Sequence, residues 1–122
     1  MEQGEGVNWA ITHKEDDAIM GTISLGIAMK HARGSLGYWL GVPFWNHGYM
    51  SEAALAVTNY AIDNLSLHRV EAMCFPRNDA SRRVMEKAGL SFEGVLTGYF
   101  RKAGIFEDVA LYAKVATVQG RA

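Results

Sequence analysis

The stretch GVPFWNHGYMSEAALAV, from Gly41 to Val57, decides the fold of this chain. Gly48 stands just before an aliphatic pattern, and almost nothing in the stretch is charged. From Ser51 to Leu65 the apolar side chains recur with helical spacing, which predicts an amphipathic helix. They stand at i, i+3, i+7 and i+11: Ala54, Val57, Ala61 and Leu65.

Strand-like segments lie on both sides of this helix. Residues 7–13, 18–29 and 35–42 are rich in β-branched and aromatic side chains, and short turns separate them, which predicts an antiparallel meander. Residues 69–75 predict a fourth strand, which ends at Pro76. A helix between the third and fourth strands favours a right-handed crossover and makes these two strands parallel neighbours.

A second helix is predicted over residues 77–90. Asn78 is a good N-cap, and Asp79 stands where the helix dipole favours an anion. Gly89 falls at the position of a left-handed C-terminal cap.

The chain ends in a predicted hairpin of residues 91–101 and 105–115, joined by RKAG, with residues 116–122 as a frayed tail. We therefore expect one domain over residues 1–122 with an α+β or α/β fold. Its order is strand, strand, strand, helix, strand, helix, strand, strand, which gives a mixed, mostly antiparallel sheet with one parallel pair and flanking helices.

Composition narrows the function. The 122 residues suit one domain, and the net charge of −1 gives no global reason to bind nucleic acid or an anionic membrane. The single cysteine, Cys74, excludes an internal disulfide, and the four histidines have no metal-binding spacing, so we expect no metal. We find no secretory signal or membrane-spanning run, and we expect a cytoplasmic location.

The turn around Gly48 predicts an anion site. The first amides of a helix have no partner within the helix, the dipole adds partial positive charge, and glycine lets a ligand approach the backbone. A phosphate or pyrophosphate fits such a turn without any lysine. The alternative is a simple turn glycine. Neither the GxxxxGK[ST] pattern nor GxGxxG occurs.

Three blocks occur in a fixed order: GYWLGVPFWNHGYMSEA (37–53), NDAS (78–81) and RRVMEKAGLSFEG (82–94). With them the sequence resembles the GNAT superfamily of acetyl-CoA-dependent N-acetyltransferases, and within it the Rim-type branch, which includes the N-terminal acetyltransferases of ribosomal proteins. The resemblance covers about Val7 to Val115. It implies acetyl-CoA as cofactor, an amine acceptor, and a slot for the thioester where the parallel strands splay apart.

The resemblance also implies cofactor-binding residues. The strand end at Trp39 and Leu40 would pair its backbone with the pantetheine arm. The family's pyrophosphate loop maps onto Trp45–Met50, where only Gly48 matches strictly, and the helix start follows. The residues implied there are Asn46, His47, Gly48, Tyr49, Met50 and Ser51; for His47 the alternative is an exposed turn histidine.

Asn78 matches the family's asparagine near the acetyl end of the cofactor. Ser81, one turn further on, matches the Rim-type serine thought to protonate the leaving CoA thiolate. The alternative for both residues is helix capping. Arg82 and Arg83 would reach the 3′-phosphate, or else form a solvated face. Met85 stands where many members of the superfamily have a tyrosine acid.

Glu71 is the candidate base for the attacking amine, and its alternative is a surface carboxylate. Cys74 is read as a small apolar strand residue, so we expect no acetyl-cysteine. Much of the rate enhancement would come from holding the two reactants together.

The familiar fold starts with one more strand and two helices, so this chain begins at its second strand. We expect a truncated or minimal member, or a second copy that covers the exposed edge at residues 7–13, and we favour a homodimer.

Two other functions compete with acetyl transfer to a protein N-terminus or a small amine. One is a non-catalytic acyl-CoA-binding or regulatory domain. The other is an assembly module in which Trp9, Trp39 and Trp45 serve packing. An assembly module would not bind the cofactor, whereas the enzyme and the binding domain would. Of these two, only the enzyme would turn over. Tyr99, Phe100 and Phe106 are candidate walls of the acceptor pocket, or core.

Overall fold

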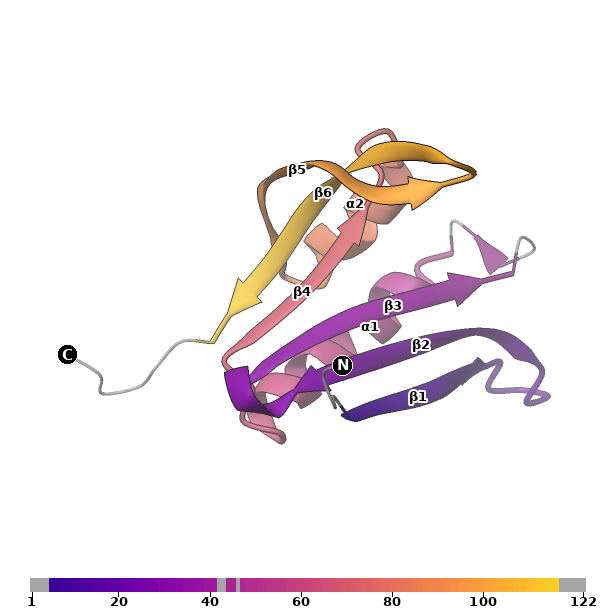
Figure 1. Ribbon diagram of the computed structural model, residues 1–122. Coiled ribbons are helices and arrows are strands. Elements are labelled where there is room, and N and C mark those ends of the chain that lie inside the picture. Colours follow the sequence, from indigo (N-terminus) through magenta and orange to yellow (C-terminus); the bar gives the residue numbers. More distant parts are fainter. Residues whose placement is uncertain (1–4, 42–43, 46, 117–122) are drawn as a thin grey trace.

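The computed structural model describes residues 5–41, 44–45 and 47–116. A six-stranded sheet with the order β1-β2-β3-β4-β6-β5 forms its frame (Figure 1). The neighbouring strands are antiparallel except β3 and β4, which are parallel. The predicted mixed sheet is thereby confirmed. The strands are β1 (Glu5–Thr12), β2 (Ile19–Ala28), β3 (Arg33–Leu40), β4 (Arg69–Cys74), β5 (Ser91–Lys102) and β6 (Ile105–Val115).

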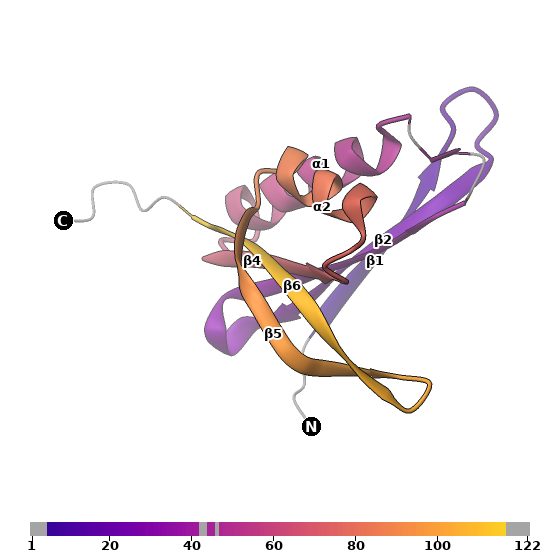
Figure 2. The same ribbon diagram turned by 90° about the horizontal axis from the view of Figure 1, so that it is seen from above.

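Two helices cover one face of this sheet and pack against each other (Figure 2). Helix α1 (Tyr49–Asp63) links β3 to β4, and helix α2 (Asp79–Lys87) links β4 to the final hairpin. Both predicted helices exist. The first begins two residues earlier than predicted, because the left-handed Gly48 lets the chain turn directly into it.

The core lies between the sheet and the helices. Strand β2 buries alternate side chains, as a strand with one covered face must. The helices meet them with small side chains, which lets α1 approach the sheet closely. Each fully buried aliphatic side chain contributes about 1.5–3 kcal/mol. Buried examples are Ile23, Leu25 and Ile27 on β2, Val70 and Ala72 on β4, and Ala54, Val57 and Ala61 on α1.

The β5–β6 hairpin turns more tightly than predicted. Ala103 and Gly104 have φ values of 51° and 80°, as a two-residue turn of the primed type needs. Lys102 pairs with Ile105 directly beside the turn. The loop is therefore two residues long instead of the predicted 101–104.

The parallel pair β3–β4 is short, and the two strands then diverge. Beyond the third pair the strands separate toward their carboxyl ends (Figure 1). The sheet therefore has two halves joined at one end, β1-β2-β3 and β4-β6-β5. The joining pairs are Arg33 with Arg69, Gly34 with Val70, and Ser35 with Glu71.

Strands β1 and β5 are the two outer strands of the described sheet. The predicted exposed edge at residues 7–13 corresponds to β1, which pairs with β2. Among the helices of the described ranges, none has the length and apolar character needed to cross a bilayer.

Candidate functional site

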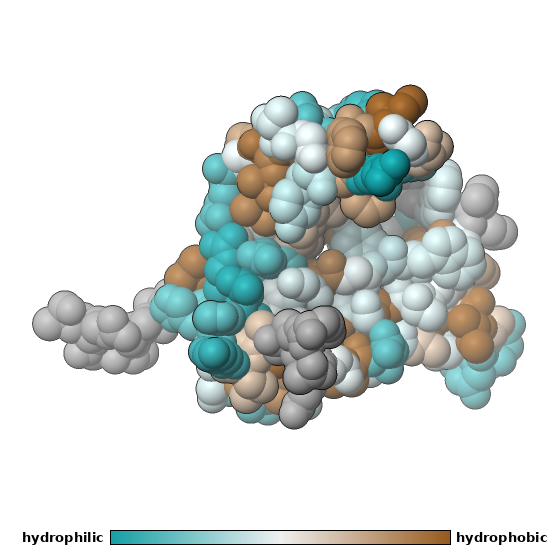
Figure 3. All heavy atoms as spheres, in the orientation of Figure 1, coloured by the Kyte–Doolittle hydropathy of each residue, from teal (hydrophilic) through white to brown (hydrophobic). Residues whose placement is uncertain are grey.

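A cavity of about 970 Å³ opens where β3 and β4 diverge. Its walls come from the carboxyl halves of both strands, from the first turn of α1, from one side of α2 along its length, and from β5 and β6. Figure 3 shows the surface hollowed between the part that carries β5 and β6 and the part that carries β1 to β3. A cavity of this size holds a ligand as large as a drug or cofactor.

Gly48 forms the rim of the cavity at the start of α1. Its φ of 80° lies in the left-handed region, and an added Cβ would meet nothing within 4 Å. The amide of Glu52 makes the first helical bond, 3.0 Å to the carbonyl oxygen of Gly48. The amides of Tyr49, Met50 and Ser51 come before it and have no acceptor within the helix. This end of α1 is therefore suited to an anion, as the sequence predicted.

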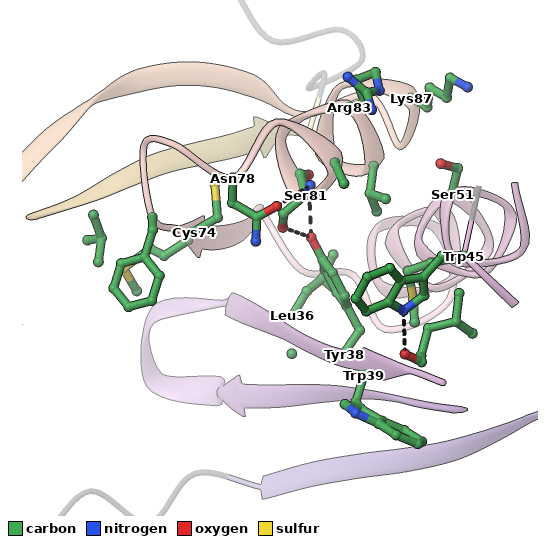
Figure 4. Close-up of a pocket in the computed structure, with 18 of the residues that line it drawn as sticks. Leu36, Tyr38, Trp39, Trp45, Ser51, Cys74, Asn78, Ser81, Arg83 and Lys87 are labelled. Atoms are coloured by element: carbon green, nitrogen blue, oxygen red, sulfur yellow. Dashed lines mark hydrogen bonds between the residues drawn. The ribbon is translucent and has the colours of Figure 1, made fainter. Parts of the chain in front are cut away.

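The large side chain of Met50 does not obstruct this turn. It is 5% exposed and belongs to the hydrophobic core. On the other side of the turn, the indole of Trp45 donates a hydrogen bond to the carbonyl oxygen of Leu40 (Figure 4). The loop before α1 is thus tied to the end of β3.

Asn78 and Ser81 open helix α2 at the inner wall of the cavity. The Oδ1 atom of Asn78 accepts a hydrogen bond of 3.0 Å from the amide of Ser81, so the predicted N-cap is confirmed. The cap uses the carbonyl end of the side chain and leaves the NH₂ group free of that bond. The hydroxyl of Ser81 lines the cavity.

Tyr38 reaches the same point from the opposite wall. Its side chain rises from β3, and its hydroxyl lies 2.5 Å from Oγ of Ser81 (Figure 4). The next residue along the strand, Trp39, also borders the cavity and is 63% exposed. Two hydroxyl groups, from different elements, therefore meet where the strands diverge.

Burial sets the protonation of the groups around Ser81. It raises the pKa of the Tyr38 phenol, although the hydrogen bond with Ser81 acts against this rise. It also raises the pKa of the Cys74 thiol, again with Ser81 acting in the opposite direction. Both groups are therefore protonated at neutral pH.

Two cations of α2 stand at the other end of the cavity. Arg83 and Lys87 line it and point away from Ser81 toward solvent (Figure 4). They lie on the side of the cavity that also holds the start of α1 near Ser51. Together with the free amides of α1, they make this end electropositive.

Most of the predicted cofactor-binding residues come together in this one cavity. His47 lies outside the cavity wall, beside the ring of Tyr49, and Asn46 lies outside the described residues. Tyr99 and Phe100 form walls, while Phe106 is exposed and stands apart. The predicted residues that line the cavity are Trp39, Leu40, Gly48, Tyr49, Met50, Ser51, Asn78, Ser81 and Arg83.

Glu71 needs a correction, because its position does not fit the predicted role of base. It lies in the paired part of β4, opposite Ser35, and does not line the cavity. Its carboxylate accepts a hydrogen bond of 2.8 Å from Nε of Arg69, whose other nitrogens bind Glu93. Strand alternation could have shown this, since Glu71 and Cys74 are three residues apart and so face opposite sides of the sheet.

Sequence reasoning missed Tyr38 and Lys87. Tyr38 lies within the block that carries the resemblance, but only the fold shows that β3 passes within reach of α2. Lys87 is one helical turn beyond Arg83 on the same helix face, a spacing that could have identified it.

The described residues offer no metal centre. No cluster of three or more His, Cys, Asp or Glu side chains occurs among residues 5–41, 44–45 and 47–116.

Comparison with known proteins identifies this arrangement. The profile of the Acetyltransferase (GNAT) domain matches residues 1–91. The uncharacterized N-acetyltransferase YoaA of Bacillus subtilis is 33% identical over 115 residues, which are 93% of this chain and 65% of YoaA. The chain thus spans less than two thirds of this curated relative.

Solved structures agree. The ribosomal-protein-S5-alanine acetyltransferase of Vibrio fischeri superposes with a TM-score of 0.83 at 27% identity, over 90% of this chain and 61% of that one. The microcin C7 self-immunity acetyltransferase MccE, solved with acetyl-CoA and AMP, superposes with a TM-score of 0.81 at 25% identity, over 91% of this chain and 61% of that one.

Proposed function

Since the chain belongs to the GNAT acetyltransferase domain family, we propose that it transfers the acetyl group of acetyl-CoA to a primary amine. One observation carries this proposal. The first amides of α1 and the hydroxyl of Ser81 border the same cavity, which lies in the gap between β3 and β4. This cavity would offer an anion site at one end and a proton donor at the other.

The residues of the cavity fit acetyl-CoA in three parts. The amides at Gly48 and the following residues would hold the pyrophosphate, where open space beside Gly48 admits it. Arg83 and Lys87 would hold the 3′-phosphate. The end of β3 at Trp39 and Leu40 would pair with the pantetheine arm.

The bound cofactor supplies an activated acetyl thioester, and the chain positions it for attack by the amine. The gap between β3 and β4 would direct the acetyl end toward Ser81 and Asn78. The NH₂ group of Asn78 remains available as a donor, because the cap uses only Oδ1. The hydroxyl of Ser81 would donate the proton that the leaving thiolate needs.

The acceptor is proposed as a protein N-terminus or a small amine. Tyr99 and Phe100 would form its apolar wall. The chain is also proposed to form a homodimer, with its outer strands as candidate contact edges. Sedimentation at micromolar concentrations tests the dimer, and a monomer mass throughout that range would contradict it. The cytoplasmic location stays a prediction.

One observation favours a second candidate, a non-catalytic acyl-CoA-binding domain. The described residues that line the cavity include no carboxylate and no histidine, so they offer no side-chain base of the usual kind. An amine that reaches the cavity already neutral, or that loses its proton to water, would remove this objection.

The experiment has two stages. Thermal unfolding with acetyl-CoA comes first, because a ligand at about 100 times its dissociation constant stabilises the fold by about 2.7 kcal/mol. Release of CoA thiol in the presence of amines and N-terminal peptides comes second. No shift at millimolar acetyl-CoA contradicts both candidates, whereas a shift without thiol release supports the binding domain alone.

A further inference from the structure

We propose that Tyr38 is a positioning residue for Ser81 and the source of the proton that Ser81 passes to the leaving thiolate. The inference rests on the proposed function and deepens it at the end of the cavity where Ser81 would donate a proton. The relation between the two hydroxyl groups carries it: Oη of Tyr38 lies 2.5 Å from Oγ of Ser81, across the gap between β3 and α2.

The surrounding contacts are compatible with a relay that runs from Tyr38 through Ser81, since either hydroxyl of the pair can donate. The amide of Ser81 is held by Oδ1 of Asn78, so the backbone of Ser81 is anchored in the first turn of α2. The carbonyl oxygen of Ser81 lies 3.5 Å from the hydroxyl of Tyr38, within its reach as a second acceptor. When the phenol donates to Oγ of Ser81, the proton of Ser81 is free to point into the cavity.

The acidities make the phenol a better proton source than the hydroxyl of Ser81 alone. A phenol titrates near 10 and an alkyl thiol at about 8.5–9, whereas an aliphatic alcohol is a far weaker acid. Ser81 alone would become a strongly basic alkoxide, and the phenol relieves this by supplying a proton of nearly matched acidity. The burial of Tyr38, which raises the pKa of its phenol, keeps it protonated before the reaction.

The proton balance closes. The carbon–sulfur bond of the thioester breaks, and its electron pair goes to sulfur. Sulfur takes the proton of Ser81 as Oγ takes the proton of Tyr38. The proton that the attacking amine loses returns to the phenolate through water, so both hydroxyl groups end as they began.

Other titratable groups share the cavity with Tyr38. Cys74 faces the same region from β4 and raises the pKa of the phenol. The remaining ones stand on the walls: Tyr49 of α1, Arg83 and Lys87 of α2, and Tyr99 of β5. Met85 takes no part, because it is 1% exposed in the core. The tyrosine hydroxyl near Ser81 thus comes from β3, whereas α2 has Met85 at the position where many family members have a tyrosine.

The first test compares Tyr38→Phe, Ser81→Ala and the double variant, with acetyl-CoA and the amine that the wild type uses best. We expect Tyr38→Phe to lower kcat by about 10- to 100-fold, which reaches only the lower end of the range of about 10²–10⁴-fold that a positioned acid or base contributes. The KM for acetyl-CoA should change by no more than about twofold, because the lost interaction acts in the transition state. The double variant should be no slower than Ser81→Ala, since both residues serve one step.

The matched control is Tyr60→Phe, which removes one hydroxyl group from α1 at a site outside the cavity. It should keep the wild-type kcat. Thermal unfolding with acetyl-CoA checks that each variant still folds and binds.

The second test replaces Tyr38 by 3,5-difluorotyrosine, which keeps the shape and lowers the pKa of the phenol. The falling alkaline limb of the kcat profile should move to lower pH, a result that packing alone does not produce. An unchanged profile, or an unchanged kcat in Tyr38→Phe while Ser81→Ala is slow, overturns the inference and leaves the proposed function standing. A wild type that binds acetyl-CoA but acetylates no amine overturns both.

Discussion

Nε1 of Trp45 lies 2.7 Å from the carbonyl oxygen of Leu40 and donates a hydrogen bond to it. This bond joins the loop before α1 to the carboxyl end of β3, so it sets the distance between the two places proposed for the pyrophosphate and the pantetheine arm. The indole is 54% exposed, and packing contributes little to its position. The hydrogen bond is therefore one tie between loop and strand, beside the bond of 2.9 Å from the amide of Phe44 to the carbonyl oxygen of Gly41.

Trp45→Phe should raise the KM for acetyl-CoA and leave kcat nearly unchanged. Loss of one hydrogen bond costs about 0.5–1.5 kcal/mol, which corresponds to roughly a 2- to 12-fold rise. Steady-state kinetics measure both constants. A lower KM would show instead that the indole competes with the cofactor for the carbonyl of Leu40.

Gly48→Val should weaken acetyl-CoA binding by about tenfold or more, a loss of about 1.4 kcal/mol. The side chain would occupy the open space beside the turn, and the φ of 80° disfavours any Cβ. Titration calorimetry gives the dissociation constant.

Gly104→Val is the matched control, because Gly104 has the same φ of 80° and equally open surroundings, but lies in the β5–β6 turn. It carries similar backbone strain and should bind acetyl-CoA like the wild type. Equal weakening in both variants would trace the effect to strain and count against the phosphate turn.

Glu93→Gln should lower the melting temperature at neutral pH. Arg69 donates two hydrogen bonds to Glu93, at 2.8 and 3.1 Å, and these bonds hold the pKa of the carboxyl below its ordinary 4.5. A lowered pKa means stability that is full above about pH 4.5 and is lost as the pH falls through the folded-state value.

The difference in melting temperature between the wild type and Glu93→Gln should therefore disappear at acidic pH. Thermal unfolding followed by circular dichroism at neutral pH and at about pH 3 measures it. An equal difference in melting temperature at both pH values would show that the effect comes from packing and not from charge.

Cys74 should react slowly with iodoacetamide at neutral pH. Its side chain is 9% exposed, and burial raises the pKa of the thiol above its ordinary 9.0. Because only the thiolate reacts, a higher pKa leaves a smaller reactive fraction at a given pH. Mass spectrometry of the labelled chain, with the urea-unfolded chain as reference, gives the ratio of rates. Equal rates in the two states would contradict the buried position, and acetyl-CoA should slow the native rate further.

The fold was largely predictable because each element carries a local signal. Asn78 caps α2 as expected, and Gly89, with a φ of 92°, ends it in the left-handed conformation. The parallel pair followed from the crossover through α1. The element ends were less certain: α2 ends at Lys87, three residues before the predicted end, because Ala88 and the left-handed Gly89 form its C-terminal cap.

The site was predictable where it depends on one segment, and less so where segments meet. Gly48 and Ser81 belong to local motifs and were found by them. The Tyr38–Ser81 contact joins residues 43 positions apart, so no local spacing could show it. Glu71 was chosen as the candidate base for its place on the fourth strand, but the pleat of β4 turns its side chain to the face opposite Cys74.

The short β3–β4 pairing bears on which acyl groups the proposed transfer could accept. With only three residue pairs between the halves of the sheet, side-chain packing sets the width of the gap, and no continuous backbone ladder does. In the proposed acetyl transfer, buried side chains at its edge, such as Leu36 and Cys74, would thus limit the length of the acyl group. Trimming them would favour propionyl and longer donors over acetyl without any change in the strands themselves.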